Sequence, residues 1–208
     1  MNLKQYVKRH LIFVICLFVI GYGIIAYIQI VCPEKIGQPH TGDAAFAFAP
    51  VYNEAGSTFH AKLGIGYQRG LLILEAVISL FAVLMLYRLM EYYCIFFEIK
   101  RIWSYFVDFS MASALARLSE RLLGNYTLDY LYIRAGHGTY DFFDFCIGIC
   151  VAGVLIWIIP FYGKYHKYKK LHTVGMNFVQ KFLWEMKLSF QLLKTSFCPI
   201  KTWWKDID

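Results

Sequence analysis

Two aspartates in the second half of the chain carry the residue type and spacing that acid–base chemistry needs. Asp129 and Asp144 flank a short segment, Tyr130–Phe143, whose glycines allow the chain to double back. If the two carboxylates face each other, they cannot both ionise easily, so one of them keeps its proton. The ionised carboxylate can then take a proton from water, while the protonated one donates to a scissile carbonyl oxygen. This is the chemistry of an aspartyl peptidase, which forms no covalent intermediate.

The same two residues also have a simpler interpretation. Asp129 would be a solvated acid in a loop, and Asp144 would cap the helix that follows, a position where aspartate is favoured. Because the protons of a close pair belong to both members, the sequence names neither residue as the acid or the base.

The chain that must position these residues has the composition of a membrane protein. Of its 208 residues, 59% are hydrophobic and 17% are charged, and its mean hydropathy is +0.48. Soluble domains are less apolar and more charged, so the composition argues against a disordered chain and against a soluble enzyme. The six cysteines follow no disulfide or zinc pattern, and no nucleic-acid-reading module accompanies the net charge of +7.

Three segments are long and apolar enough to cross a bilayer as helices: Leu11–Cys32, Gly70–Tyr87 and Phe145–Gly163. A fourth segment, Ile102–Leu123, is less apolar, because it contains Asp108, Arg117, Glu120 and Arg121. We predict that it also spans the membrane, since the distribution of basic residues requires an even number of spans.

Basic residues are concentrated in three regions of the chain. These are the first ten residues, the segment 88–101, and the tail 164–208, which holds nine lysines. Four spans place all three regions on one side of the membrane, the side that the positive-inside rule assigns to the cytoplasm. The sequence therefore predicts an all-α, four-helix membrane bundle with both termini in the cytoplasm.

Two further elements are predicted outside these spans. The outer segment 32–69 contains glycines and a short alternating apolar stretch, Ala44–Val51, so we expect a small β-sheet platform there. In the tail, apolar residues recur at spacings of three and four, as on one face of a helix: Val179, Phe182, Leu183, Met186, Phe190 and Leu193. Such a basic amphipathic helix lies on the cytoplasmic leaflet or packs against another protein.

The sequence resembles the lipoprotein signal peptidases (signal peptidase II) over roughly residues 1–163. The family's Ala-Leu-Gly-Asn-Leu-x-Asp-Arg motif corresponds to Ala114–Arg121, and Asp129 follows that motif at the family's spacing. Its second motif, Phe-Asn-x-Ala-Asp, corresponds to Tyr140–Asp144. The segment Thr41–Phe46 is similar to the family's Asn-x-Gly-Ala-Ala-Phe strand.

This resemblance implies a function, which is cleavage of prolipoproteins just before a diacylglyceryl-modified cysteine. It implies a peptidase-like domain over residues 1–163, followed by the tail 164–208, with the site at the extracytoplasmic face of a bacterial inner membrane. Asp129 and Asp144 correspond to the family's catalytic pair. The residues expected to support the pair or to bind substrate are Glu120, Arg121, Asp141, Arg69 and Arg117. We expect no cofactor, no metal, no nucleic-acid partner, and a monomer in contact with membrane lipids.

Several of these supporting residues depart from the family's pattern. Arg117 and Asp141 stand where the family has asparagines, and Glu120 stands where it has aspartate. The extra carboxylate of Asp141 is expected to add negative charge beside the pair and so to favour protonation of one member. Three interpretations stay open: an active divergent peptidase, a relative with another substrate, or a degenerate homologue. The competing class is a non-catalytic membrane protein, such as a transporter component or an assembly factor.

Overall fold

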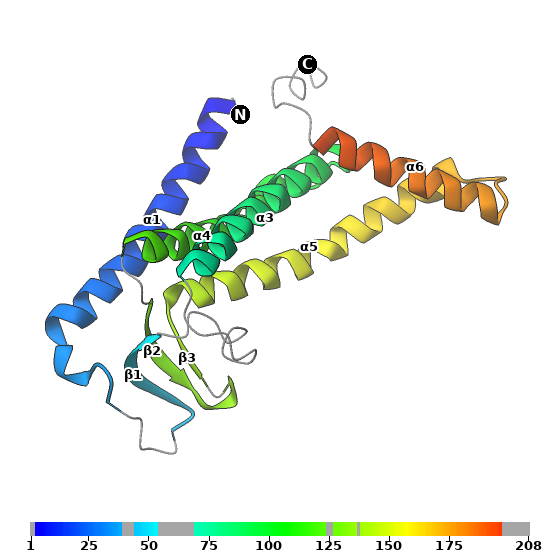
Figure 1. Cartoon of the computed structure of the whole chain (residues 1–208). Helices are drawn as coiled ribbons and strands as arrows, with labels where there is room; N and C mark the ends of the chain where they lie inside the picture. Colours follow the sequence, from blue (N-terminus) through cyan, green and yellow to red (C-terminus); the bar gives the residue numbers. More distant parts are fainter. Residues whose placement is uncertain (1–2, 39–43, 54–68, 124–126, 137, 197–208) are drawn as a thin grey trace. The chain divides into compact units, whose positions relative to one another are not determined.

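Helices form most of the chain, and three short strands lie between them. The computed structural model describes residues 3–38, 44–53, 69–123, 127–136 and 138–196. The α-helices are α1 (Leu3–Val31), α3 (Arg69–Phe96), α4 (Tyr105–Leu123), α5 (Phe142–His172) and α6 (Phe178–Ser196) (Figure 1). The strands are β1 (Phe46–Asn53), β2 (Thr127–Ile133) and β3 (Gly138–Tyr140), and the 3₁₀ turns are η1 (Pro33–Lys35), η2 (Arg101–Ser104) and η3 (Arg134–Gly136).

Three helices are long and apolar enough to cross a membrane, and they confirm the three apolar segments predicted from the sequence. They are Lys8–Val31 within α1, Gly70–Phe96 within α3, and Phe142–His172, which is α5. Among the helices that the structure describes, α4 does not meet this measure. A fourth span, and with it a four-helix bundle, is therefore not confirmed.

The charged residues of α4 lower its hydropathy. The fold gives these residues partners within the protein. Near the start of α4, Asp108 lies buried against His10 of α1, with 2.6 Å between Oδ2 and Nδ1. One turn further along, Ala112 packs against Val14 and Leu17 of α1. Protein therefore surrounds the polar side of this helix, which lipid could not solvate.

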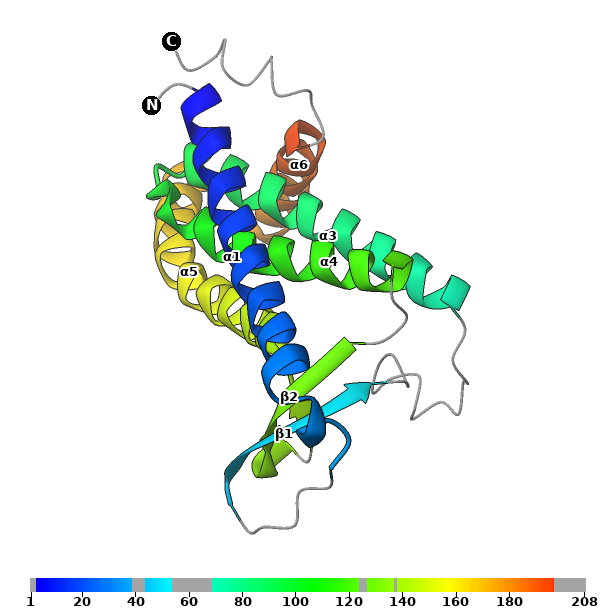
Figure 2. The same ribbon diagram turned by 90° about the vertical axis from the view of Figure 1, so that its left-hand side faces the viewer.

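The three strands form one antiparallel sheet in the order β1-β2-β3. The register pairs Phe46 with Ile133 and Asn53 with Thr127, with an irregularity between Phe48 and Val51. The expected β platform therefore exists, but only β1 comes from the segment 32–69. The other two strands come from residues 127–140, because the segment that doubles back does so as a hairpin. Both views show the sheet beyond the C-terminal end of α1 (Figures 1 and 2).

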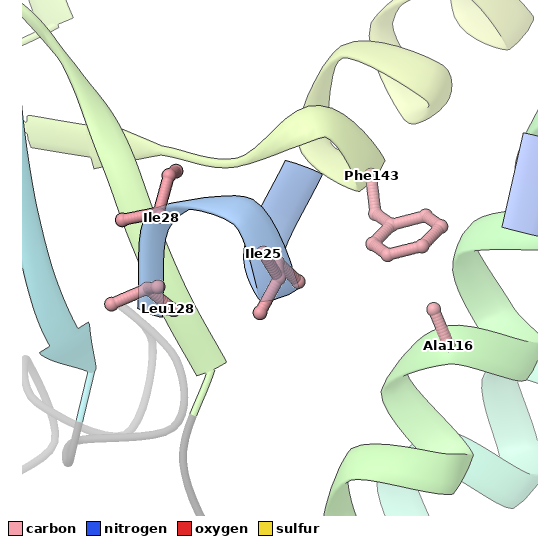
Figure 3. Packing of buried hydrophobic residues seen from close by; sticks show 5 residues of the cluster. All are labelled: Ile25, Ile28, Ala116, Leu128 and Phe143. Carbon is pink, nitrogen blue, oxygen red and sulfur yellow. The ribbon is translucent and has the colours of Figure 1, made fainter. Parts of the chain in front are cut away.

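The chain divides into two compact units, and the first contains the sheet. This unit comprises Met1–Val83 and Phe106–Val151. One of its apolar clusters joins α1, α4, β2 and the first turn of α5 through Ile25, Ile28, Ala116, Leu128 and Phe143 (Figure 3). Because this cluster includes the residue before Asp144, it fixes where α5 begins.

A glycine of α1 makes this packing possible. The Phe143 ring lies so close to Gly21 that a Cβ at this position would collide with it. The neighbouring glycine of the same helix, Gly23, has open space around the position of its Cβ. Gly21 therefore admits the Phe143 ring, whereas Gly23 has no such role.

The second unit comprises Leu84–Tyr105 and Ala152–Asp208. Here Phe97, the residue after α3, packs on α5 through aromatic rings: it lies 5.4 Å from Phe161, which stacks on Trp157 at 4.9 Å, both measured between ring centroids. The helix predicted in the basic tail is present as α6.

Candidate functional site

The β2–β3 hairpin brings together the acids that the sequence analysis singled out. Asp129 lies in β2, and the pairing of Leu131 with Tyr140 returns the chain to the start of α5, which carries Asp144. Carboxylate oxygens of Asp129, Asp141 and Asp144 all lie within 4.8 Å of one another. Asp129 is a strand residue with only 3% of its surface exposed, so it is not a solvated loop acid.

Asp141 and Asp144 cap the N-terminus of α5 reciprocally. The Asp144 backbone N–H donates to Asp141 Oδ1 at 2.9 Å, and the Asp141 backbone N–H donates to Asp144 Oδ2 at 3.1 Å. This is a capping box, in which two otherwise unpaired backbone donors are satisfied at once. Asp144 therefore takes part in capping α5, but as the third helical residue of the box; the N-cap residue itself is Asp141.

Arg117 of α4 binds the cluster from the other side. Its Nη2 donates to Asp141 Oδ1 and to Asp144 Oδ1, each at 2.8 Å. Its Nη1 donates to Glu120 Oε2 at 3.2 Å. Two departures from the signal peptidase pattern, Arg117 and Asp141, therefore form an ion pair with each other. The Asp141 carboxylate, which we expected to add negative charge beside the pair, lies directly against this guanidinium, and the guanidinium offsets part of that charge.

Asp129 has a different environment, in which none of the described cations lies in hydrogen-bond contact with it. Its Oδ2 accepts a hydrogen bond from the Asn53 side chain at 3.0 Å, and its buried Oδ1 has no hydrogen-bond partner within the described residues. Burial raises the pKa of Asp129 to about 6; the Asn53 hydrogen bond opposes this rise, and the charge of Asp144 adds to it. A carboxyl in such surroundings keeps its proton more readily than one in water.

Asn53 was missed by the sequence analysis. The resemblance placed the expected asparagine before the apolar strand, and no clean counterpart was found there. The structure has an asparagine at the other end of the strand, as the last residue of β1. The sequence did contain a signal for this residue, namely a polar asparagine at the end of the short apolar segment Phe46–Asn53.

Asp129 and Asp144 both line one cavity of about 640 Å³. From the acids the cavity extends along α3 and α4, where small side chains line it: Ala76, Ser79, Ala82, Ser110, Ser113 and Ala114. Small residues on helices allow another backbone to approach closely within a membrane. The wall that α3 and α4 give to this cavity is therefore one that another backbone can approach closely.

The remaining predicted site residues fall into different places. Arg121 is buried and lines the same cavity as the acids. Glu120 is buried as well, and besides pairing with Arg117 it lines a second cavity of about 420 Å³ between α1 and α4. Arg69 begins α3, and its side chain lies outside the described residues.

Three clustered carboxylates are also a ligand set for a hard cation such as Mg²⁺ or Ca²⁺. Here the Arg117 guanidinium already binds Asp141 and Asp144 at hydrogen-bond distance. The cluster thus contains its own cation, and the residues do not favour a metal site.

This fold is similar to two solved structures, each described as a bacterial membrane enzyme studied by the in meso method. The one at 2.3 Å resolution has a TM-score of 0.53 and 14% sequence identity, over 74% of this chain and 89% of that chain. The one at 1.9 Å has a TM-score of 0.52 and 15% identity, over 74% of this chain and 94% of that chain. No family model and no curated protein matches the sequence. The chain is therefore a membrane protein whose fold is shared with bacterial membrane enzymes.

Proposed function

We propose that the protein is an intramembrane aspartyl endopeptidase with Asp129 and Asp144 as its catalytic pair. The observation that carries this proposal is the convergence of the two carboxylates, from β2 and from α5, on one cavity. The environments of the two residues differ, and this difference suggests a role for each.

Asp144 is suited to the role of base. It accepts one hydrogen bond from the Arg117 guanidinium and one from the Asp141 backbone N–H. Hydrogen bonds from a cation and from a helix N-terminus stabilise a carboxylate rather than a carboxylic acid. Asp129 is suited to the role of acid, since it is buried and its partner Asn53 is neutral.

The reaction then follows with all protons accounted for. Asp144 takes a proton from water as the water oxygen attacks the scissile carbonyl carbon, and Asp129 gives its proton to the carbonyl oxygen. The resulting diol collapses as the C–N bond breaks. The leaving nitrogen receives the proton from Asp144, and Asp129 recovers one from a diol hydroxyl. The products are an acid and an amine, and both aspartates return to their starting states.

The proposed substrate is a diacylglyceryl-modified prolipoprotein, cut just before its lipidated cysteine. Two features support this substrate: the sequence motifs resemble those of lipoprotein signal peptidases, and the cavity extends along the apolar helix α3. Acyl chains would stay in lipid while the scissile bond reaches the aspartates. We further propose that the site faces the extracytoplasmic side, that both termini are cytoplasmic, and that the enzyme acts as a monomer without a cofactor.

The test is cleavage of a synthetic diacylglyceryl prolipoprotein by the purified chain in detergent, followed as a mobility shift on a gel. Asp129→Asn and Asp144→Asn should each remove cleavage, and the double variant should be scarcely worse than either single variant, because the pair acts as a unit. The matched control is Glu34→Gln, which changes an exposed acid of η1. Cleavage at the normal rate by either aspartate variant would refute the proposal.

The second candidate is a non-catalytic role. It is favoured by the ion pairs of Arg117 with Asp141 and Asp144. In this alternative, the ion pair between Arg117 and Asp144 serves only to hold the start of α5 in place. In that case the wild-type chain cleaves nothing, and the aspartate variants change its stability only.

A further inference from the structure

The apolar row of α6 is exposed along its length. Within the part of the helix whose side chains are described, the exposed fractions lie between 55% and 83% for six residues: Phe178, Val179, Phe182, Leu183, Met186 and Phe190. They recur at the helical spacing and so share one face of α6. A continuous apolar face of this size in a folded chain marks a contact surface.

The opposite face of α6 holds the helix against the end of α5. Trp184 lies against His172, with 6.0 Å between ring centroids and 18° between ring planes. Glu185 forms a salt bridge with Lys169, and Leu188 is buried. Since a residue advances about 100° around a helix, Trp184 and Leu188 lie opposite the apolar row, whereas Glu185 lies at its edge, beside Phe178. The back of α6 is therefore bound within the chain, and the apolar row points outward.

The connection between α5 and α6 fixes this orientation. Gly175 adopts a φ of +78°, which turns the chain sharply. Asn177 and Gln180 then form reciprocal side-chain to backbone hydrogen bonds of 2.9 and 3.1 Å at the start of α6. A capped helix after a short turn cannot easily rotate its apolar row toward α5.

The lysines near the α5–α6 junction, and its distance from the apolar part of α5, indicate what covers the apolar row of α6. The apolar part of α5 ends near Gly163, and four exposed or half-exposed lysines follow in its last turns: Lys164, Lys167, Lys169 and Lys170. At 1.5 Å per residue, the α6 contacts on α5 lie within about 14 Å of that end, a distance that covers a headgroup layer of about 5–8 Å and the water just beyond it. Lys181 and Lys187 add exposed positive charge on α6, whose one acid among its described side chains, Glu185, is already paired.

We propose that α6 lies in the plane of the membrane surface, with its apolar row inserted among anionic lipids of the leaflet where α5 ends. The lipid supplies both chemistries that the helix needs, acyl chains for the row and negative headgroups for the lysines. The docked back face ties the end of α5 to that surface. This inference does not depend on the proposed peptidase function.

The test measures the depth of spin labels in nanodiscs that hold one chain each, after replacement of the six native cysteines. Single labels replace Leu183 and Met186 on the apolar row and the exposed Lys181, which lies off that row. With anionic lipid present, the row labels should lie about 5–10 Å below the phosphates and collide mainly with oxygen. The Lys181 label should collide mainly with the water-soluble nickel reagent.

Three outcomes would overturn the inference. Water-soluble reagent that reaches the row labels freely shows that lipid does not cover this face. Protection that arises only in discs with two chains shows that a second copy covers it. Equal insertion into purely zwitterionic lipid removes the role assigned to anionic headgroups, since attraction to the lysines should then be lost.

Discussion

Replacing Asp129 by asparagine should stabilise the protein while removing its proposed activity. Burial raises the pKa of Asp129 to about 6, about two pH units above its ordinary value of 3.8. The folded chain therefore binds this proton more tightly than the unfolded chain does. This tighter binding of the proton adds to the free energy of unfolding. The contribution is fully present below about pH 4 and is lost as the pH rises through about 6. Each pH unit corresponds to about 1.4 kcal/mol, so the loss approaches about 3 kcal/mol.

Asparagine has no such titration and can still accept the hydrogen bond from Asn53. The gain of Asp129→Asn over wild type should therefore be near zero at pH 4 and between about 1 and 3 kcal/mol at pH 8. For a chain of this size, that corresponds to a rise in the unfolding midpoint of about 3 to 10 °C. Thermal unfolding in mild detergent, measured at several pH values, provides the comparison, with Glu34→Gln as the exposed control. A gain that does not grow with pH would show that burial does not raise the pKa of Asp129.

The other predictions concern the groups that surround the pair. Removing the amide in Asn53→Ala should raise the pKa of Asp129, and because the reaction needs that residue protonated, the alkaline limb of the pH–rate profile should move to higher pH. Arg117→Asn should destabilise the fold by about 3–5 kcal/mol, since it leaves buried carboxylates without their cation, and adding Asp141→Asn should recover much of that loss in unfolding experiments. Gly21→Leu should push the Phe143 ring away and cost about 1–3 kcal/mol in unfolding free energy, with a lower kcat.

Two matched controls lie beside these positions. Tyr52→Phe removes a hydroxyl beside Asn53 that accepts a hydrogen bond from Gln29, and Tyr52 lines the second cavity rather than the one with the acids, so the pH profile should stay unchanged. Gly23→Leu adds the same side chain to α1 where a Cβ meets open space, so it should be tolerated. If the two glycine variants behave alike, the close approach of Phe143 is not what requires glycine at position 21. Additive effects of the Arg117 and Asp141 variants would show that these residues are not coupled.

Local patterns in the sequence were enough to predict the features that depend on one segment at a time. Uninterrupted apolar runs predicted the helices α1, α3 and α5, and the spacing of apolar residues predicted α6. The glycines after Asp129 indicated a chain reversal, which the β2–β3 hairpin provides. The threonine, tyrosines and isoleucine of Thr127–Ile133 are residue types enriched in strands, a signal that the sequence analysis did not use.

Features that depend on two distant segments were not predictable in this way. The distribution of basic residues predicted a fourth span in spite of its low hydropathy. Hydropathy scores Asp108 as a charge facing lipid, whereas His10, far away in the sequence, pairs with it. Arg117 and Asp141 each looked like a defect of a motif, and only their 2.8 Å contact shows that they compensate each other. The partner strands of β1 were missed for the same reason, since sheet pairing is set by neighbours that are remote in the chain.

The reciprocal cap at the start of α5 links the proposed chemistry to the order in which the chain is made. Asp144 is positioned by backbone groups that acquire this geometry only when the first turn of α5 has formed. During translation, the ribosome adds α5 after α1, β1, α3, α4 and β2, so every other part of the pair's surroundings is synthesised earlier. Under the proposed function, a nascent chain is proteolytically silent until this late helix folds.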